Sequence, residues 1–323
     1  MNIKKIIIVL GEPNSVFSEI LGKYFTKRKK LKKKIIIIGN YKLFKQQLNI
    51  LGFKIKVDRI ENIFEAKFNK LNLIDIEFKY NKVFSKLSSK SNDYIKKSFD
   101  VALKILSKEK DAVLINGPIS KKNFLKSKYL GITEYLSKRT KSKKEVMLIY
   151  NKDFSVSPIT THLPIKLVSK AINEKKIVGN VIAINNFYKK VLNKKPKFAV
   201  LGLNPHCESI LKNNEEKKFI IPAIKKIKQK NISISGPFSA DTFFLKDNRE
   251  KFDIAIGMYH DQVLTPIKTI YNFNAINITI GLPFIRISPD HGPNISMVGK
   301  KKSDATSIAC AMDFINKLKI SAN

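Results

Sequence analysis

The chain has 323 residues, of which 43% are hydrophobic and 27% are charged, a globular composition with room for one large or two joined α/β domains. Its net charge of +36 is a weak indication of nucleic-acid binding, because lysine is spread through nearly every segment instead of gathering with arginine and aromatic residues. No run of about 18 uncharged apolar residues is present to span a membrane. Cys207 and Cys310 lie far apart, which fits a reducing compartment. We therefore expect a cytoplasmic protein with neither a nucleic-acid nor a membrane partner.

Short runs of β-branched residues, each closed by a turn residue, predict the buried strands of a mostly parallel sheet. In chain order these runs are Ile6–Leu10, Ile35–Gly39, Ala112–Asn116, Phe198–Leu203, Ile254–Met258 and Ile276–Ile280. Between them, apolar residues at helical spacing predict helices over Tyr94–Leu106 and Phe219–Ile227. The alternation of strands and helices indicates an α/β fold.

Polar clusters follow four of these strands, and open α/β sheets bind ligands beyond the carboxyl ends of their strands. His206 follows the fourth run and His260 the fifth, while His162 lies in a further cluster, TTHLP. One such histidine alone is more simply explained by a structural role. Imidazoles from three separate loops, however, are suitable ligands for Zn²⁺, Mn²⁺ or Co²⁺, and Asp261 is available to orient one of them. Together they predict a divalent metal site.

Several longer strings resemble the 4-hydroxythreonine-4-phosphate dehydrogenase family of pyridoxal phosphate biosynthesis. They are NGPISK, TEYL, TTHLP, GLNPH, GPFSADTFF, MYHDQ and NITIGLPFIRISPDHG, and their order and spacing match along nearly the whole chain. The resemblance implies a homodimer of two-domain α/β/α subunits, related in fold to isocitrate and isopropylmalate dehydrogenases. We expect one domain at residues 1–130 plus 290–323, on the cofactor side, and the other at 131–289. The active site would lie in the interdomain cleft at the dimer interface.

Carried over by position, the resemblance also implies the site residues. The metal ligands, shared between two subunits, fall on His162, His206 and His260. The substrate contacts fall on Thr133, Lys268, Asn277 and Arg286. Lys268 and Arg286 suit a phosphate or a carboxylate by charge and hydrogen-bond geometry, although each would also fit a surface salt bridge.

The implied reaction is a metal-dependent oxidation of 4-phosphooxy-L-threonine, followed by decarboxylation to 3-amino-2-oxopropyl phosphate. A secondary alcohol held by a Lewis acid can pass hydride to NAD or NADP, and the β-keto acid formed loses CO₂ readily. The metal would be Zn²⁺, Mg²⁺, Mn²⁺ or Co²⁺. We expect Asp261 and Lys268 to be the catalytic side chains, and His291 with Gly292 to contact the cofactor. The chain has no GxGxxG fingerprint, which the family does not use.

Several positions depart from the family pattern. Ile132 replaces the histidine of G-H-T-E, Val263 follows HDQ in place of glycine, and Ser296 replaces an aspartate. The glycine-rich first loop reads GEPNSVFSE. Two alternatives therefore stay open. The first is the same chemistry on a related acid such as phosphothreonate or phosphoerythronate, which the lost polar contact at Ile132 favours. The second is a non-catalytic relative that binds a metal or a ligand.

Overall fold

The computed structural model describes residues 3–28, 30–125, 129, 131–142, 144–209, 213–289 and 292–318. The chain divides into two compact units, Met1–Ser142 with Leu282–Asn323 (unit 1) and Lys143–Gly281 (unit 2). Each unit is an α/β structure with helices packed on a sheet, so the expected fold class is confirmed. Within the described ranges, no helix is long and apolar enough to cross a membrane.

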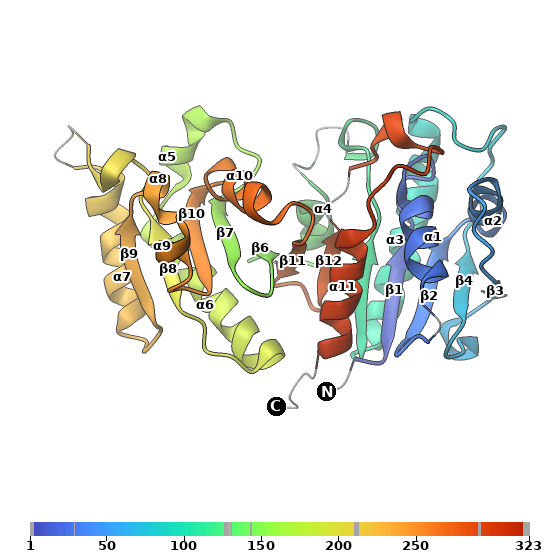
Figure 1. Ribbon diagram of the computed structural model, residues 1–323, viewed down its shortest axis with the longest axis horizontal. Helices are drawn as coiled ribbons and strands as arrows, with labels where there is room; N and C mark the ends of the chain where they lie inside the picture. Colours follow the sequence, from blue (N-terminus) through green and yellow to red (C-terminus); the bar gives the residue numbers. More distant parts are fainter. Residues whose placement is uncertain are drawn as a thin grey trace. The chain divides into compact units, whose positions relative to one another are not determined.

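The sheet of unit 1 has the strand order β3-β4-β2-β1-β5-β12, and these neighbours pair in parallel. The strands are β1 Lys5–Val9, β2 Lys34–Gly39, β3 Val57–Ile60, β4 Leu71–Asp75, β5 Ala112–Asn116 and β12 Arg286–Pro289. The helices are α1 Phe17–Thr26, α2 Tyr41–Ile50, α3 Asn92–Lys108, α4 Ile132–Arg139 and α11 Thr306–Lys317. The helix α1 lies beside α2 and α11 (Figure 1). The isoleucine-rich β1 and β2 are buried almost throughout, as strands covered on both faces must be.

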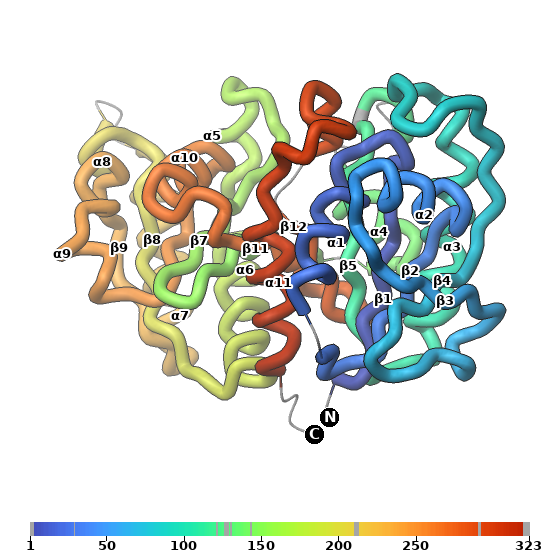
Figure 2. Tube along the Cα trace, turned by 45° about the vertical axis from the view of Figure 1, so that its right-hand side comes forward, coloured from blue at the N-terminus to red at the C-terminus, as the bar shows by residue number. Residues whose placement is uncertain are grey.

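The sheet of unit 2 has the order β11-β6-β7-β10-β8-β9. The strands are β6 Val146–Tyr150, β7 Ser155–Thr160, β8 Phe198–Leu201, β9 Ile234–Phe238, β10 Ile254–Tyr259 and β11 Ile276–Ile280. The helices are α5 Val168–Ala171, α6 Glu174–Phe187, α7 Ile221–Lys228, α8 Ala240–Phe243, α9 Lys246–Arg249 and α10 His260–Tyr271. The strand β6 is antiparallel to both of its neighbours, whereas the other pairs are parallel. The helices α6 and α7 pack side by side (Figure 2).

Short helical turns complete the chain. Those of 3-10 type are Ile63–Glu65, Ser89–Ser91, Ile165–Leu167, Pro205–Cys207 and Ile295–Met297, and those of π type are Lys121–Leu125, Tyr188–Leu192 and Glu216–Ile220. All six strands expected from β-branched runs are present, with ends that differ by a residue or two. The strand β7 was not expected, because it buries Ser155 and Ser157. Their hydroxyls donate to the backbone oxygens of Asn151 and Met147 at 3.1 and 2.6 Å.

The limits of the two units differ from the expected domain boundaries at 130/131 and 289/290. The helix α4 belongs to unit 1, because Tyr135 and Leu136 pack in a core with residues of β1 and β2. The strand β12 also belongs to unit 1, because Arg286 and Ile287 pair with Leu114 and Ile115 of β5. Thr133 and Arg286, which we had expected in the second domain, therefore lie in unit 1.

Candidate functional site

Two of the three expected metal ligands lie together in unit 2. His162 follows β7, and His260 begins α10 directly after β10. These strands pair in parallel, with Thr160 opposite Tyr259, so both histidines emerge at the same sheet edge. Their ring centroids are 5.7 Å apart. Two imidazoles bound to one metal, with bonds of about 2 Å, place their centroids roughly 5 to 6 Å apart, so the spacing fits a shared ion.

Asp261 orients one of these rings. The His260 Nδ1 lies 2.6 Å from the Asp261 Oδ1. When a carboxylate accepts a hydrogen bond from Nδ1, the Nε2 atom is left deprotonated and available to a metal. Both histidines and Asp261 line a pocket of about 400 Å³ that also includes Thr160 and Tyr259.

His206 lies on a separate turn after β8, between Asn204 and Glu208, and is exposed. In the part of the chain that the structure describes, no three His, Cys, Asp or Glu side chains are grouped closely enough to hold a metal ion. One chain therefore brings His162 and His260 together but does not bring His206 to them. His162 and His206 share one unusual feature, backbone φ angles of 52° and 55°. Such left-handed conformations are costly for residues with side chains and gather at functional sites.

Arg286, a predicted substrate contact, lies at the start of β12 and is only 1% exposed. Its Nε donates to the Asn116 Oδ1 at 2.8 Å, and its Nη1 donates to the Thr133 Oγ1 at 3.1 Å. Burial lowers the pKa of Arg286 to about 10, against the opposing effect of the Glu134 carboxylate. The guanidinium is therefore still a cation at neutral pH, and the alternative of an ordinary surface salt bridge does not apply to it.

A cavity of about 570 Å³ in unit 1 adjoins this cluster. Its lining includes Asn116, which bonds Arg286, and Ile132, which precedes Thr133 in α4. The rest of the wall includes four aliphatic side chains, Leu87, Ile119, Leu125 and Ile295, and four polar ones, Ser120, Lys122, Ser288 and Asn294. Gly292, an expected cofactor contact, also lines the cavity, whereas His291 lies outside the described residues.

The other two expected substrate contacts belong to unit 2. Lys268 is half-buried on α10, where burial lowers its pKa, and its Nζ lies 5.9 Å from the Phe273 ring centroid. Asn277 lies on β11 opposite Ile149 of β6. Its Oδ1 is buried and accepts no hydrogen bond from the residues that the structure describes. A buried acceptor of this kind is costly unless a ligand supplies a donor.

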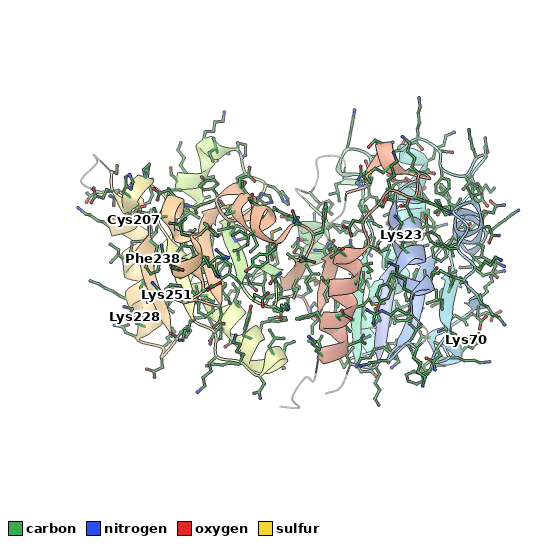
Figure 3. All side chains as sticks on the ribbon, in the orientation of Figure 1. Lys23, Lys70, Cys207, Lys228, Phe238 and Lys251 are labelled. Carbon is green, nitrogen blue, oxygen red and sulfur yellow. The ribbon has the colours of Figure 1, made fainter. Side chains whose placement is uncertain are left out.

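Sequence reasoning missed two buried polar residues that hold the histidine turns. Gln262 accepts from the Met258 backbone N–H at 2.6 Å and donates to the Gly202 oxygen at 2.7 Å, so it joins the ends of β10 and β8. Glu216 accepts from the backbone N–H groups of Leu203 and Asn204. These two residues precede the turn that ends at Cys207, which is labelled in Figure 3. The sequence offers a signal for Gln262, because this glutamine directly follows His260 and Asp261 in the string HDQ. It offers no signal for Glu216, because this residue is one of several charged residues in the string NNEEKK.

Comparison with known proteins shows the family to which the chain belongs. Residues 31–315 match the family described as pyridoxal phosphate biosynthetic protein PdxA. The chain belongs to this family. It is 36% identical over 323 residues to the 4-hydroxythreonine-4-phosphate dehydrogenase of Sulfurihydrogenibium sp. (strain YO3AOP1), and the match covers 98% of each chain. It is 28% identical over 324 residues to the D-threonate 4-phosphate dehydrogenase of Salmonella typhimurium (strain LT2), covering 97% of this chain and 99% of the other.

Solved structures give the same family and fold. The crystal structure of 4-hydroxythreonine-4-phosphate dehydrogenase from Klebsiella pneumoniae superposes with a TM-score of 0.84 at 25% identity, covering 97% of each chain. The isocitrate dehydrogenase from Methylococcus capsulatus has a TM-score of 0.51 at 9% identity and covers 97% of this chain and 85% of its own, which is a likeness of fold alone. The family that the sequence motifs predicted and the likeness in fold to isocitrate dehydrogenases are thus confirmed.

Proposed function

We propose that the protein oxidises 4-phosphooxy-L-threonine with NAD or NADP, and that the β-keto acid formed loses CO₂ to give 3-amino-2-oxopropyl phosphate for pyridoxal phosphate biosynthesis. Membership of the PdxA family and the name of the relative at 36% identity support this activity. In the structure, the observation that carries the proposal is the pair of His162 and His260, with ring centroids 5.7 Å apart and Asp261 on the Nδ1 of His260.

The pair fits a divalent metal, because the spacing of the two rings suits one ion and the Asp261 carboxylate on the His260 Nδ1 leaves Nε2 as a possible ligand. A catalytic zinc site has three protein ligands and one open position. We assign the third ligand to His206 of a second copy of the chain, so that a homodimer has two shared sites. Imidazole donors favour Zn²⁺ over Mg²⁺, while Mn²⁺ and Co²⁺ are the other candidates.

When bound, the metal supplies Lewis-acid activation of the substrate hydroxyl, and the nicotinamide accepts the hydride. The hydroxyl loses its proton while its carbon gives up hydride; the bond to the carboxylate then breaks, CO₂ leaves, and the carbon that carried it takes up a proton. Asp261 keeps His260 in the tautomer that binds metal. Lys268 exchanges these protons, since burial lowers its pKa and makes its ammonium easier to deprotonate. Asn277 accepts a hydrogen bond from the substrate ammonium through its buried Oδ1.

In unit 1, the cluster of Arg286, Asn116 and Thr133 supplies the positive charge that an anionic group of the substrate requires. Asn116 and Thr133 hold two edges of the guanidinium in a fixed orientation, which favours planar recognition of phosphate or carboxylate. The adjoining cavity of about 570 Å³ is the proposed place for that group and for the cofactor contact at Gly292. His291, which lies outside the described residues, stays an expected cofactor contact.

A second candidate substrate is a phosphorylated hydroxy acid without the amino group, such as phosphothreonate or phosphoerythronate. Ile132 favours it, because this side chain lines the cavity where the family pattern has a histidine. The D-threonate 4-phosphate dehydrogenase of Salmonella typhimurium, at 28% identity, acts on an acid of this class.

The test is nicotinamide reduction by purified protein loaded in turn with each divalent metal. NAD and NADP are each combined with 4-phosphooxy-L-threonine, phosphothreonate and phosphoerythronate, and the absorbance of the reduced nicotinamide is followed. We expect metal-dependent reduction that is fastest with 4-phosphooxy-L-threonine and is abolished by a chelator. Faster reduction with phosphothreonate would select the second candidate. If a folded, metal-loaded protein reduces the nicotinamide in none of these combinations, the remaining alternative is that the chain is a non-catalytic relative that binds a metal or a ligand.

A further inference from the structure

The turn that carries His206 is conformationally strained. His206 and Cys207 have φ angles of 55° and 61°, so two successive residues with side chains adopt left-handed backbone conformations. Such conformations are unfavourable for L-amino acids and persist only where the surroundings hold them. Within the turn, the Cys207 N–H donates to the Asn204 oxygen at 3.1 Å and the Glu208 N–H donates to the Pro205 oxygen at 3.0 Å. Both bonds join residues of the turn to each other, so they do not determine where the turn lies on the unit.

A buried carboxylate fixes the start of the turn. Glu216 is 1% exposed, and its Oε1 accepts from the backbone N–H groups of Leu203 and Asn204 at 2.7 and 2.8 Å. Its Oε2 accepts from the Asn204 Nδ2 at 2.8 Å. Hydrogen bonds to an ionised carboxylate are about twice as strong as neutral ones. Among the residues that the structure describes, the neighbouring Glu215 bonds the Asn204 side chain, at 3.0 Å, and no backbone N–H of the turn.

The base of the turn is joined to the strand end that carries His260. Gln262 donates to the Gly202 oxygen at 2.7 Å and accepts from the Met258 N–H at 2.6 Å. Gly202 directly precedes the residues that Glu216 holds. Gln262 therefore fixes the base of the turn within unit 2, and Glu216 fixes the two backbone groups that follow.

We propose that Glu216 is the positioning residue for His206, and that its carboxylate holds the strained turn in the conformation in which the His206 imidazole can bind metal. This inference rests on the proposed function, because it takes His206 to be a metal ligand. It adds that the affinity of the site for metal depends on a residue that does not touch the metal. Groups that orient metal ligands contribute to affinity because a ligand already in place loses less conformational freedom on binding.

The test compares Glu216→Gln with Glu215→Gln as a matched control. Each removes one negative charge and leaves the size of the side chain nearly unchanged, but only Glu216 bonds the backbone of the turn. Full-length protein is freed of metal with a chelator and titrated with Co²⁺, by calorimetry and by the visible absorption of the bound ion. We expect Glu216→Gln to weaken Co²⁺ binding about ten- to a hundredfold and to change the absorption spectrum. Glu215→Gln should change the affinity about twofold or less.

Further variants keep the outcomes distinct. His206→Ala must weaken Co²⁺ binding in an otherwise native protein; if it does not, or if the wild-type protein binds no Co²⁺, both the proposed metal site and the role of Glu216 fall. If His206→Ala weakens binding but Glu216→Gln, folded by circular dichroism, binds as the wild type does, only the role of Glu216 falls. Should Glu216→Gln not fold, Glu216→Asp retains the charge and should show an intermediate loss of affinity. Failure of both variants to fold would mean that Glu216 serves the whole fold and would overturn the inference.

Discussion

Arg286 is a charged residue in a buried environment, with only 1% of its surface exposed. A buried guanidinium is costly unless its N–H groups are satisfied, and Asn116 and Thr133 satisfy two of them at 2.8 and 3.1 Å. A lysine at this position offers one ammonium on a flexible stem and cannot reproduce both bonds in one plane. We predict that Arg286→Lys lowers kcat/KM at least about a hundredfold, or roughly 2.7 kcal/mol of transition-state stabilisation. Steady-state kinetics measure this loss.

An exposed arginine provides the control for Arg286. The Arg59 side chain is 65% exposed and pairs with Asp75 at 2.9 Å. Exposed ion pairs contribute little to stability, so Arg59→Lys should leave both kcat/KM and the midpoint of thermal unfolding close to the wild-type values. Wild-type kcat/KM in Arg286→Lys would contradict the assignment of Arg286 to the substrate.

Lys268 should give the reaction a distinctive pH dependence. Burial lowers its pKa, so its ammonium loses the proton at a lower pH than an exposed lysine does. The charged form attracts the substrate anion, and KM should therefore rise as pH increases through this lowered pKa, below the ordinary lysine value of about 10.4. In Lys268→Arg, KM should not depend on pH in this range, while kcat should fall because a guanidinium does not release its proton. Identical pH profiles of KM in the two proteins would rule out this role.

At the scale of elements, the helix α4 contributes one residue to the cavity lining and one hydrogen-bond partner to the buried Arg286. Its first residue, Ile132, lines the cavity, and its second, Thr133, accepts the bond from Arg286. We predict that Ile132→His raises kcat/KM for 4-phosphooxy-L-threonine by about tenfold or more, because a hydrogen bond to a charged group contributes roughly 1.5–3 kcal/mol. Ile132→Val, which stays apolar, should change this value little. If Ile132→His does not raise this value but lowers kcat/KM for phosphothreonate, the isoleucine suits the second substrate.

The regular elements could be predicted where burial follows an apolar pattern, as in β1, β2 and β10. The strand β7 could not, because Ser155 and Ser157 are buried through hydrogen bonds to backbone oxygens that only the folded chain brings near. In the site, the sequence grouped His162 and His260 with His206, but it could not show that only His162 and His260 come together within one chain, because this depends on the pairing of β7 with β10. The burial of Arg286 was not predictable, since Asn116 and Thr133 lie 170 and 153 positions away in the sequence.

The structure also gives a physical reason why valine is tolerated at position 263, where the family pattern has glycine. Val263 lies inside α10 and is fully buried in a core with Val156 and Ala255. A helix does not require the conformational freedom of glycine, so valine adds apolar burial there at no cost to the backbone. The substitution of Val263 for the family glycine is thus compatible with an intact His260 turn.

At the scale of the whole molecule, one chain does not bring His206 to His162 and His260, so a metal site with all three ligands requires a second copy of the chain. A two-fold symmetric dimer presents the same surfaces twice, so a pair from one copy can meet the single histidine of the other in two equivalent sites. An interface that two copies maintain permanently buries on the order of 2,000 Å² or more. We therefore expect activity to depend on the dimer.

Subunit mixing tests this sharing most directly. Inactive His162→Ala and inactive His206→Ala proteins are mixed under conditions that let subunits exchange, and nicotinamide reduction is measured. In each mixed dimer, one site receives the intact pair from the His206→Ala chain and the intact His206 from the His162→Ala chain, so about half of the wild-type activity should return in that dimer. The control mixes His162→Ala with His260→Ala, where every site has lost one member of the pair, and no activity should return. Recovery in the control, or no recovery in the first mixture despite proven exchange, would contradict a metal site built from a pair on one chain and His206 on the other.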